Sequence, residues 1–154
     1  FLHREIREKG GAYGGFALYN PEDGLFCLAS YRDPHIAATL NVFERAGAFI
    51  ASGNFSEQDV NESLLQVCSE IDKPDPPAIA AKKAFHRKII SLSDEARQQF
   101  KQRLLGQTRK QVLDVAARYF DRNRETAAVA VISGEGQIAA ANKKLNNPME
   151  THRI

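Results

Sequence analysis

A turn sequence between two short apolar segments constrains the fold of this chain most. The turn, Asn20-Pro21-Glu22-Asp23-Gly24, favours a tight chain reversal because proline presets one backbone angle and glycine tolerates a left-handed one. The flanking residues 12–19 and 25–31 have the length and composition of β-strands, although Gly14 and Gly15 weaken the first of them. Because so short a connection joins antiparallel strands, we expect a β-hairpin here.

Most of the remaining chain carries the periodicity and the end signals of helices. Apolar residues recur at three- and four-residue steps, and capping residues or helix breakers stand at several of the ends. The predicted helices are residues 1–9, stopped by Gly10-Gly11; a helix opened by Asp33-Pro34 with Asp33 as N-cap; a helix from Ser56 to the proline-rich break at 73–77; residues 78–89; a helix capped by Ser93; a helix from the capping-box pair Thr108 and Gln111 through Phe120; and a short helix after residues 133–136.

A short, continuous apolar run lies near the carboxy terminus, at residues 127–132. Such a run is typical of a strand covered on both faces, and we expect it to lie in the same sheet as the hairpin. The order of helix, two strands, several helices and a strand indicates an α+β fold, in which an antiparallel sheet packs against several helices. Because 154 residues are the size of one domain, we predict a single domain over residues 1–154.

Composition argues against several classes of function. Hydrophobic residues make up 43% and charged residues 26%, and no apolar run approaches the roughly 20 residues of a membrane-spanning helix. The net charge of +2 gives no reason to expect a nucleic acid or a membrane as a partner. Cys27 and Cys68 lie in apolar stretches and are predicted to be buried free thiols. A helical segment begins at once at Phe1, which suggests a piece of a longer polypeptide.

The histidines do not form the pattern of a zinc hydrolase. Such a site needs two histidines one helical turn apart with a nearby carboxylate, written HExxH or HxxEH. The four histidines, His3, His35, His86 and His152, are dispersed and begin neither pattern. His86 stands among basic residues and is predicted to be solvated. We therefore expect no metal and no cofactor bound to this chain, and the motifs of serine hydrolases, P-loops and dinucleotide sites are also missing from the sequence.

The glycine-rich stretch at residues 10–15 is the remaining candidate for a site. It follows a helix rather than opening one, which argues against phosphate binding at a helix N-terminus. Glycines in a strand often mark a close approach by another backbone. Arg7 offers a planar fork of donors beside this stretch, and Tyr13 offers a hydroxyl on a rigid ring. These residue types leave two interpretations open: a substrate-binding pair, or a surface arginine beside a packed tyrosine.

Residues 3–15, HREIREKGGAYGG, resemble the arginine–tyrosine motif in the carboxy-terminal half of peptidases of the insulinase (pitrilysin) superfamily. Residues 30–34, SYRDP, are similar to a stretch of the presequence-peptidase branch, as are residues 71–74, IDKP, and the helical region through Tyr119. The resemblance covers most of residues 2–120. It identifies the chain with the carboxy-terminal, non-zinc portion of a larger zinc metallopeptidase.

The resemblance implies a role for two residues. In this family two homologous halves close around a chamber, and the amino-terminal half carries the HxxEH zinc motif and its glutamate base. The carboxy-terminal half supplies an arginine and a tyrosine to the substrate, and the motif match assigns these roles to Arg7 and Tyr13. Both would bind substrate, and Tyr13 would also be catalytic by donating to the oxyanion at the scissile carbonyl. The glycines would leave room for the peptide to lie as an added strand.

The other residues of these motifs are expected to be structural. Arg32 and Asp33 would end a strand and cap a helix, and Glu5, Glu8 and Lys9 would form a solvated helix face.

The resemblance further implies that the full-length parent is a zinc metalloendopeptidase that degrades unstructured peptides. Its zinc would lie in the amino-terminal half of the same polypeptide, which would be the partner of this chain together with peptide substrates. The chain alone is expected to be inactive. A non-catalytic peptide-binding or assembly module of the same superfamily is the alternative, and an intact HxxEH motif upstream would separate the two. We expect a soluble protein, and the resemblance allows either a bacterial cytoplasm or an organelle matrix.

Overall fold

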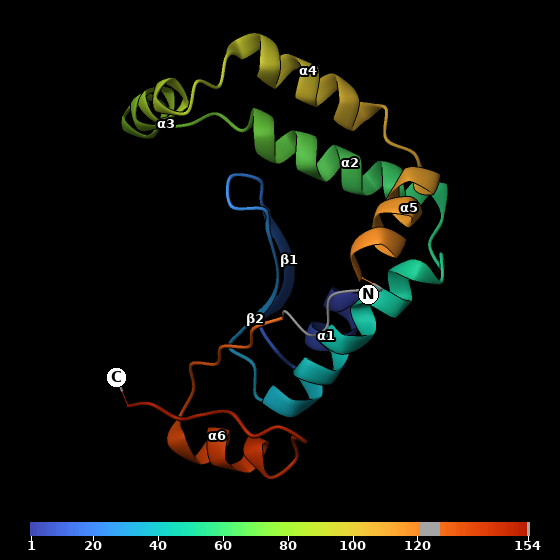
Figure 1. The fold of residues 1–154 in the computed structure, drawn as a ribbon, viewed down its shortest axis with the longest axis vertical. Coiled ribbons are helices and arrows are strands. Elements are labelled where there is room, and N and C mark those ends of the chain that lie inside the picture. The colour runs from blue at the N-terminus through green and yellow to red at the C-terminus, as the bar shows by residue number, and fades with distance from the viewer. Residues whose placement is uncertain (121–126, 154) are drawn as a thin grey trace. The chain divides into compact units, whose positions relative to one another are not determined.

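The computed structural model describes residues 1–120 and 127–153, which form helices and one antiparallel sheet (Figure 1). The chain divides into two compact units, Phe1–Ser52 with Ala116–Ile154 and Gly53–Val115, and each unit is described by itself. In chain order the elements are the π-helix η1 (His3–Glu8), the strands β1 (Gly14–Asn20) and β2 (Leu25–Tyr31), and the helices α1 (Ile36–Ala51), α2 (Glu57–Asp72), α3 (Pro77–Ile89), α4 (Asp94–Leu105), α5 (Arg109–Phe120) and α6 (Glu135–Asn142).

The predicted hairpin is confirmed, and with it the α+β fold. β1 and β2 pair antiparallel, with Gly14 opposite Tyr31 and Asn20 opposite Leu25. The turn forms as its residue types indicate: the backbone N–H of Glu22 donates to the Asn20 side chain at 3.0 Å, and Gly24 has a φ of +64°.

The first helix is present, but it is a π-helix. The backbone N–H of Lys9 donates to the carbonyl oxygen of Arg4, five residues back, at 3.0 Å. The predicted stop is confirmed, because Gly11 adopts a φ of +72°, which strongly favours glycine. The N–H of Ala12 then reaches back to the carbonyl oxygen of Ile6 at 3.1 Å. The chain therefore leaves η1 by a tight reversal and enters β1 directly.

Ile6 is the centre of the buried core in the first unit. Its side chain is only 1% exposed and packs with Ala12 and Val42, and the partly buried Phe1, Leu2 and Phe43 surround this cluster. β1 approaches Ile6 closely at Gly15, where an added Cβ would stand 3.0–3.3 Å from side-chain atoms of Ile6. A glycine at this position thus lets the sheet lie directly on η1.

The helix predicted from Asp33-Pro34 begins two residues later than expected. α1 starts at Ile36 with His35 as its N-cap residue, so the assignment of Asp33 as N-cap is wrong. The Asp33 carboxylate instead accepts the backbone N–H of His35 at 2.8 Å and the hydroxyl of buried Thr39. Asp33 therefore accepts hydrogen bonds near the start of the helix, but it connects the preceding loop to the first turn instead of capping the helix.

Sequence signals of helix ends are confirmed throughout the second unit. Ser56 caps α2 in a reciprocal capping box with Asp59, and the Ser93 hydroxyl accepts the N–H of Ala96 at the start of α4. α3 begins at Pro77, one residue before the predicted start at 78, and ends at Ile89 as predicted. The final helix, α6, is confirmed in the first unit.

The capping pair before α5 also forms as predicted. The backbone N–H of Thr108 donates to the Gln111 side chain at 2.9 Å, and the N–H of Gln111 donates to the Thr108 hydroxyl at 3.3 Å.

The predicted strand at residues 127–132 is wrong. This segment is not in a strand, and within the described part of the chain the sheet consists of β1 and β2. Val129 is 58% exposed and Ile132 is 89% exposed. An apolar run favours burial, but a strand also needs a neighbour whose backbone accepts and donates its hydrogen bonds. No described segment offers 127–132 such a neighbour.

The two cysteines differ from each other. Cys68 is a buried free thiol, as predicted. Cys27 is free but only half-buried, because it lies in β2, part of which is open to solvent.

We predict that Gly15→Ala destabilises the chain, whereas Gly136→Ala does not. A Cβ at Gly15 would press on the Cβ of Ile6 at 3.1 Å, and that atom cannot rotate away. We expect the free energy of unfolding to fall by about 1–3 kcal/mol. At Gly136, in α6, an added Cβ meets nothing within 4 Å, so alanine is expected to raise stability by about 0.5–1 kcal/mol. Urea unfolding followed by circular dichroism measures both, and equal effects would refute the close approach at Gly15.

Candidate functional site

Arg7 and Tyr13 lie together at the end of the hairpin. The guanidinium carbon of Arg7 is 5.9 Å from the centroid of the Tyr13 ring, within the range of a cation–π contact. Both side chains are exposed, and Tyr13 is 63% exposed. Tyr13 is therefore not buried in the core, and a substrate-binding role for the pair stays a prediction.

Local structure explains why two residues six positions apart meet. Arg7 lies in the last turn of η1, and the reversal through Gly11 returns the chain towards the residues it has just left. The backbone N–H of Tyr13 then donates to the carbonyl oxygen of Tyr31 at 3.1 Å, which extends the hairpin ladder by one bond. Tyr13 is therefore anchored to β2 while its ring faces Arg7.

Two further residues, Tyr31 and Arg32, join this pair. The rings of Tyr13 and Tyr31 meet edge to face, with centroids 5.9 Å apart and an interplanar angle of 89°. The guanidinium carbon of Arg32 lies 5.4 Å from the Tyr31 ring centroid. The four side chains thus form a continuous row, Arg7–Tyr13–Tyr31–Arg32, which we call the Arg–Tyr row.

Residue order alone gives little sign of this row. Its inner contact depends on the register of the hairpin, which sets Gly14 opposite Tyr31 and so brings the start of β1 to the end of β2. The sequence SYRDP marks Tyr31 and Arg32 as motif residues, but neither periodicity nor capping rules connect them to Tyr13.

Packing within the chain itself explains why Gly14 and Gly15, beside the row, are glycines. A Cβ at Gly14 would meet the end of the Phe16 ring at 2.6 Å, and one at Gly15 would meet Ile6. The space that glycine leaves at these two positions is therefore occupied by side chains of this chain. This internal packing accounts for both glycines without an added strand.

The face of the hairpin opposite Ile6 is apolar and open. Side chains alternate along a strand, so Phe16 and Leu18 of β1 lie on the face away from Gly15, with Leu25 and Tyr31 of β2 beside them. These four residues are between 46% and 58% exposed. The Arg–Tyr row borders this open apolar face.

Charges on η1 are arranged around Glu5, which is not solvated as predicted. The Glu5 side chain is only 13% exposed and accepts hydrogen bonds from Lys9 at 2.8 Å and from Arg4 at 3.1 Å. These two bonds hold the pKa of the Glu5 carboxyl below its ordinary value, and the bond from Lys9 has the larger effect. Glu8 and Lys9 are exposed, as predicted.

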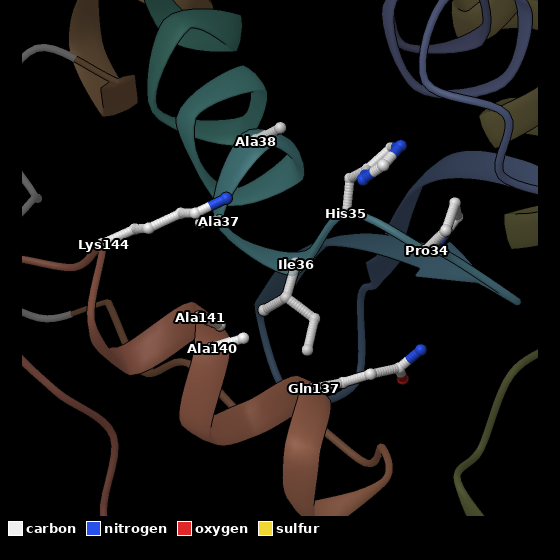
Figure 2. A pocket seen from close by; sticks show the side chains of 9 residues that line it. All are labelled: Pro34, His35, Ile36, Ala37, Ala38, Gln137, Ala140, Ala141 and Lys144. Carbon is white, nitrogen blue, oxygen red and sulfur yellow. The ribbon is translucent and has the colours of Figure 1, made fainter.

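A separate groove of about 400 Å³ lies between the start of α1 and α6 (Figure 2). Figure 2 shows Ile36 directed towards α6, where the small residues Ala140 and Ala141 lie across from it. Its polar groups are His35, Gln137 and Lys144, and its lining residues include neither a carboxylate nor a thiol. This groove is distinct from the Arg–Tyr row and offers no acid–base pair.

Metal ligands are not grouped in the described residues: nowhere there do three side chains of His, Cys, Asp or Glu come together in a way that could hold an ion. Over the same residues, none of the helices combines the length and the apolar character needed to cross a membrane.

Comparisons with known proteins agree with the sequence motifs. The chain is 39% identical to the mitochondrial presequence protease of Danio rerio over 137 residues. This match covers 89% of the chain. It is 38% identical to the mitochondrial presequence proteases of Mus musculus, over 88% of this chain, and of Eremothecium gossypii, over 86% of it. In each case the match spans only 13% of the relative's length.

A family model described as the PreP C-terminal domain matches residues 1–135. The chain therefore belongs to the PreP C-terminal domain family, and the resemblance to the presequence-peptidase branch is confirmed.

We predict that Glu5 makes the stability of the chain depend on pH in acid. Because folding lowers the pKa of Glu5 below its ordinary 4.5, the ionised form favours the fold. Its contribution is present above about pH 4.5 and is lost as the pH falls through the lower, folded pKa. Wild type is thus expected to be more stable than Glu5→Gln at pH 7, and the difference is expected to vanish in strong acid.

Urea unfolding at pH 7 and at lower pH measures this difference. The matched control is Glu8→Gln, since Glu8 is 58% exposed and lies on the same helix. If the difference in unfolding free energy between wild type and Glu5→Gln stayed constant with pH, the predicted contribution of ionised Glu5 to stability would be wrong.

Proposed function

We propose that residues 1–154 act as one domain, the carboxy-terminal, non-zinc portion of a zinc metalloendopeptidase that degrades unstructured peptides. In this proposal the domain contributes groups that bind substrate and stabilise the transition state, and it is inactive alone. Its partners are the amino-terminal zinc-bearing half of the same polypeptide and the peptide substrate. The single observation that carries the proposal is the Arg7–Tyr13 pair: a donor-rich guanidinium stacked on an exposed phenol, within the matched family segment.

The chemistry of the pair suits peptide hydrolysis. Attack of water on a peptide carbonyl places negative charge on the carbonyl oxygen, and a preorganised donor at that oxygen lowers the barrier. The Tyr13 hydroxyl is such a donor, on a ring whose position is set by Arg7 and by the backbone bond to Tyr31. The Arg7 guanidinium has N–H groups left to hold substrate carbonyls while it lies against the ring.

The described residues do not fit a zinc site, so no step on this chain passes through the metal. Zinc, which would activate the attacking water, belongs in this proposal to the amino-terminal half.

The surface of the domain supports a larger parent. Phe16, Leu18 and Leu25 expose apolar side chains on one face of the hairpin, and a contiguous apolar face of this kind usually contacts protein or peptide. The matched relatives are also much longer than this chain, because the match to one of them spans only 13% of that relative's length. Both observations fit a domain that functions against the rest of its own polypeptide.

We predict that Tyr13→Phe in the full-length polypeptide lowers kcat by about 10²–10³ with little change in KM, because one oxyanion donor is lost. Arg7→Ala is expected to raise KM as well as lower kcat, and lysine is expected to rescue poorly because it lacks the planar fork. Steady-state kinetics on an unstructured peptide, with a melting curve for each variant, measures these effects.

The matched control is Tyr19→Phe, since Tyr19 lies in β1, the strand that Tyr13 precedes, and is 64% exposed against 63% for Tyr13. Unchanged kcat in Tyr13→Phe would remove this residue from the mechanism.

We also predict that the isolated chain neither retains stoichiometric zinc nor cleaves peptides, because its four histidines form no HExxH or HxxEH pattern. Metal analysis after dialysis and a quenched fluorescent peptide assay test this. One zinc per chain with chelator-sensitive cleavage would refute it.

A further inference from the structure

Tyr13 is exposed, and an exposed phenol is a poor oxyanion donor unless something fixes its ring. Tyr13 is 63% exposed. Arg7 supplies one contact, at 5.9 Å from the ring centroid. Preorganisation requires a second contact from another direction, because a ring held on one side only still pivots about its side-chain bonds.

Tyr31 supplies that second contact. It meets the Tyr13 ring at an interplanar angle of 89° and a centroid separation of 5.9 Å, the geometry in which the positive edge of one ring faces the negative face of the other. The same residue accepts the backbone N–H of Tyr13 at 3.1 Å. Tyr31 therefore fixes both the main chain and the ring of Tyr13.

Arg32 in turn holds Tyr31. Its backbone has a φ of +49°, a left-handed conformation that is uncommon for a residue other than glycine, and its guanidinium carbon lies 5.4 Å from the Tyr31 ring centroid. The next residue, Asp33, accepts the N–H of His35 at 2.8 Å and the hydroxyl of Thr39, which fastens the chain just beyond the left-handed residue. The surrounding bonds thus maintain a conformation that Arg32 by itself disfavours.

Resting on the function proposed above, we propose that Tyr31 and Arg32 are positioning residues for Tyr13. They do not touch the reacting atoms; they limit the directions in which the Tyr13 hydroxyl can point. Tyr31 acts through its ring and its carbonyl oxygen, so its own hydroxyl is not required. Arg32 acts through its guanidinium over the Tyr31 ring.

The test is a double-mutant cycle in the full-length polypeptide, with kcat and KM for an unstructured peptide and a melting curve for each variant. We expect Tyr31→Leu to lower kcat about three- to tenfold, the size of one edge-to-face contact, with KM nearly unchanged. Tyr31→Phe is expected to retain wild-type kcat because it keeps the ring. In a Tyr13→Phe background, Tyr31→Leu is expected to change kcat less than twofold, because there is no longer a hydroxyl to position.

Two further variants guard against a purely structural effect. Tyr19→Leu removes a similarly exposed tyrosine near the turn end of the hairpin and is expected to leave kcat unchanged. Arg32→Asn removes the guanidinium but keeps a residue that tolerates the left-handed backbone, so it tests the row even if Tyr31→Leu fails to fold. Its loss of kcat is also expected to disappear in the Tyr13→Phe background.

The outcomes separate this proposal from the function it rests on. If Tyr13→Phe is impaired and the Tyr31 or Arg32 variants reduce kcat by the same factor in both backgrounds, the positioning role is wrong and the proposed function stands. If Tyr13→Phe is silent, the proposed function itself is wrong, and the positioning role is refuted along with it.

Discussion

Burial of Ile6 is the contact on which the rest of the first unit depends. Its side chain is almost completely buried, at 1% exposure, and it joins the helix on which it lies to two other elements. It lies on η1, packs with Val42 of α1, and stands against β1 at Gly15. Full burial of a side chain of this size contributes on the order of 1.5–3 kcal/mol, a large share for a unit with so few buried residues.

The candidate site follows from this packing. Because Ile6 is buried between sheet and helix, its neighbour Arg7 is directed to the outside of the last turn of η1. Because Gly11 reverses the chain and Gly15 admits the sheet, Tyr13 arrives beside Arg7 rather than continuing away from it. The same short segment thus builds a core contact on one side and an exposed Arg–Tyr pair on the other.

Much of this arrangement could be predicted because its causes are local. The turn at Asn20–Gly24, the Ser56 cap and the Ser93 cap each act through residues within a few positions of one another. The predictions for residues 127–132 and for Cys27 failed because the causes there are not local. The strand at 127–132 needs a partner strand that no described segment supplies, and the degree of burial of Cys27 depends on which part of the sheet is covered.

By itself, the sequence determined the hairpin, nearly all the helix ends and, through the segment at residues 3–15, the family, and it singled out Arg7 and Tyr13 as candidate site residues. Local hydrogen bonds and backbone angles suffice for the first two, and a motif suffices for the third. Only the tertiary structure decided that Tyr31 and Arg32 continue the pair into a row, and that Gly14 and Gly15 accommodate Phe16 and Ile6. Those contacts depend on strand register and on packing between elements, which join residues that no local rule connects.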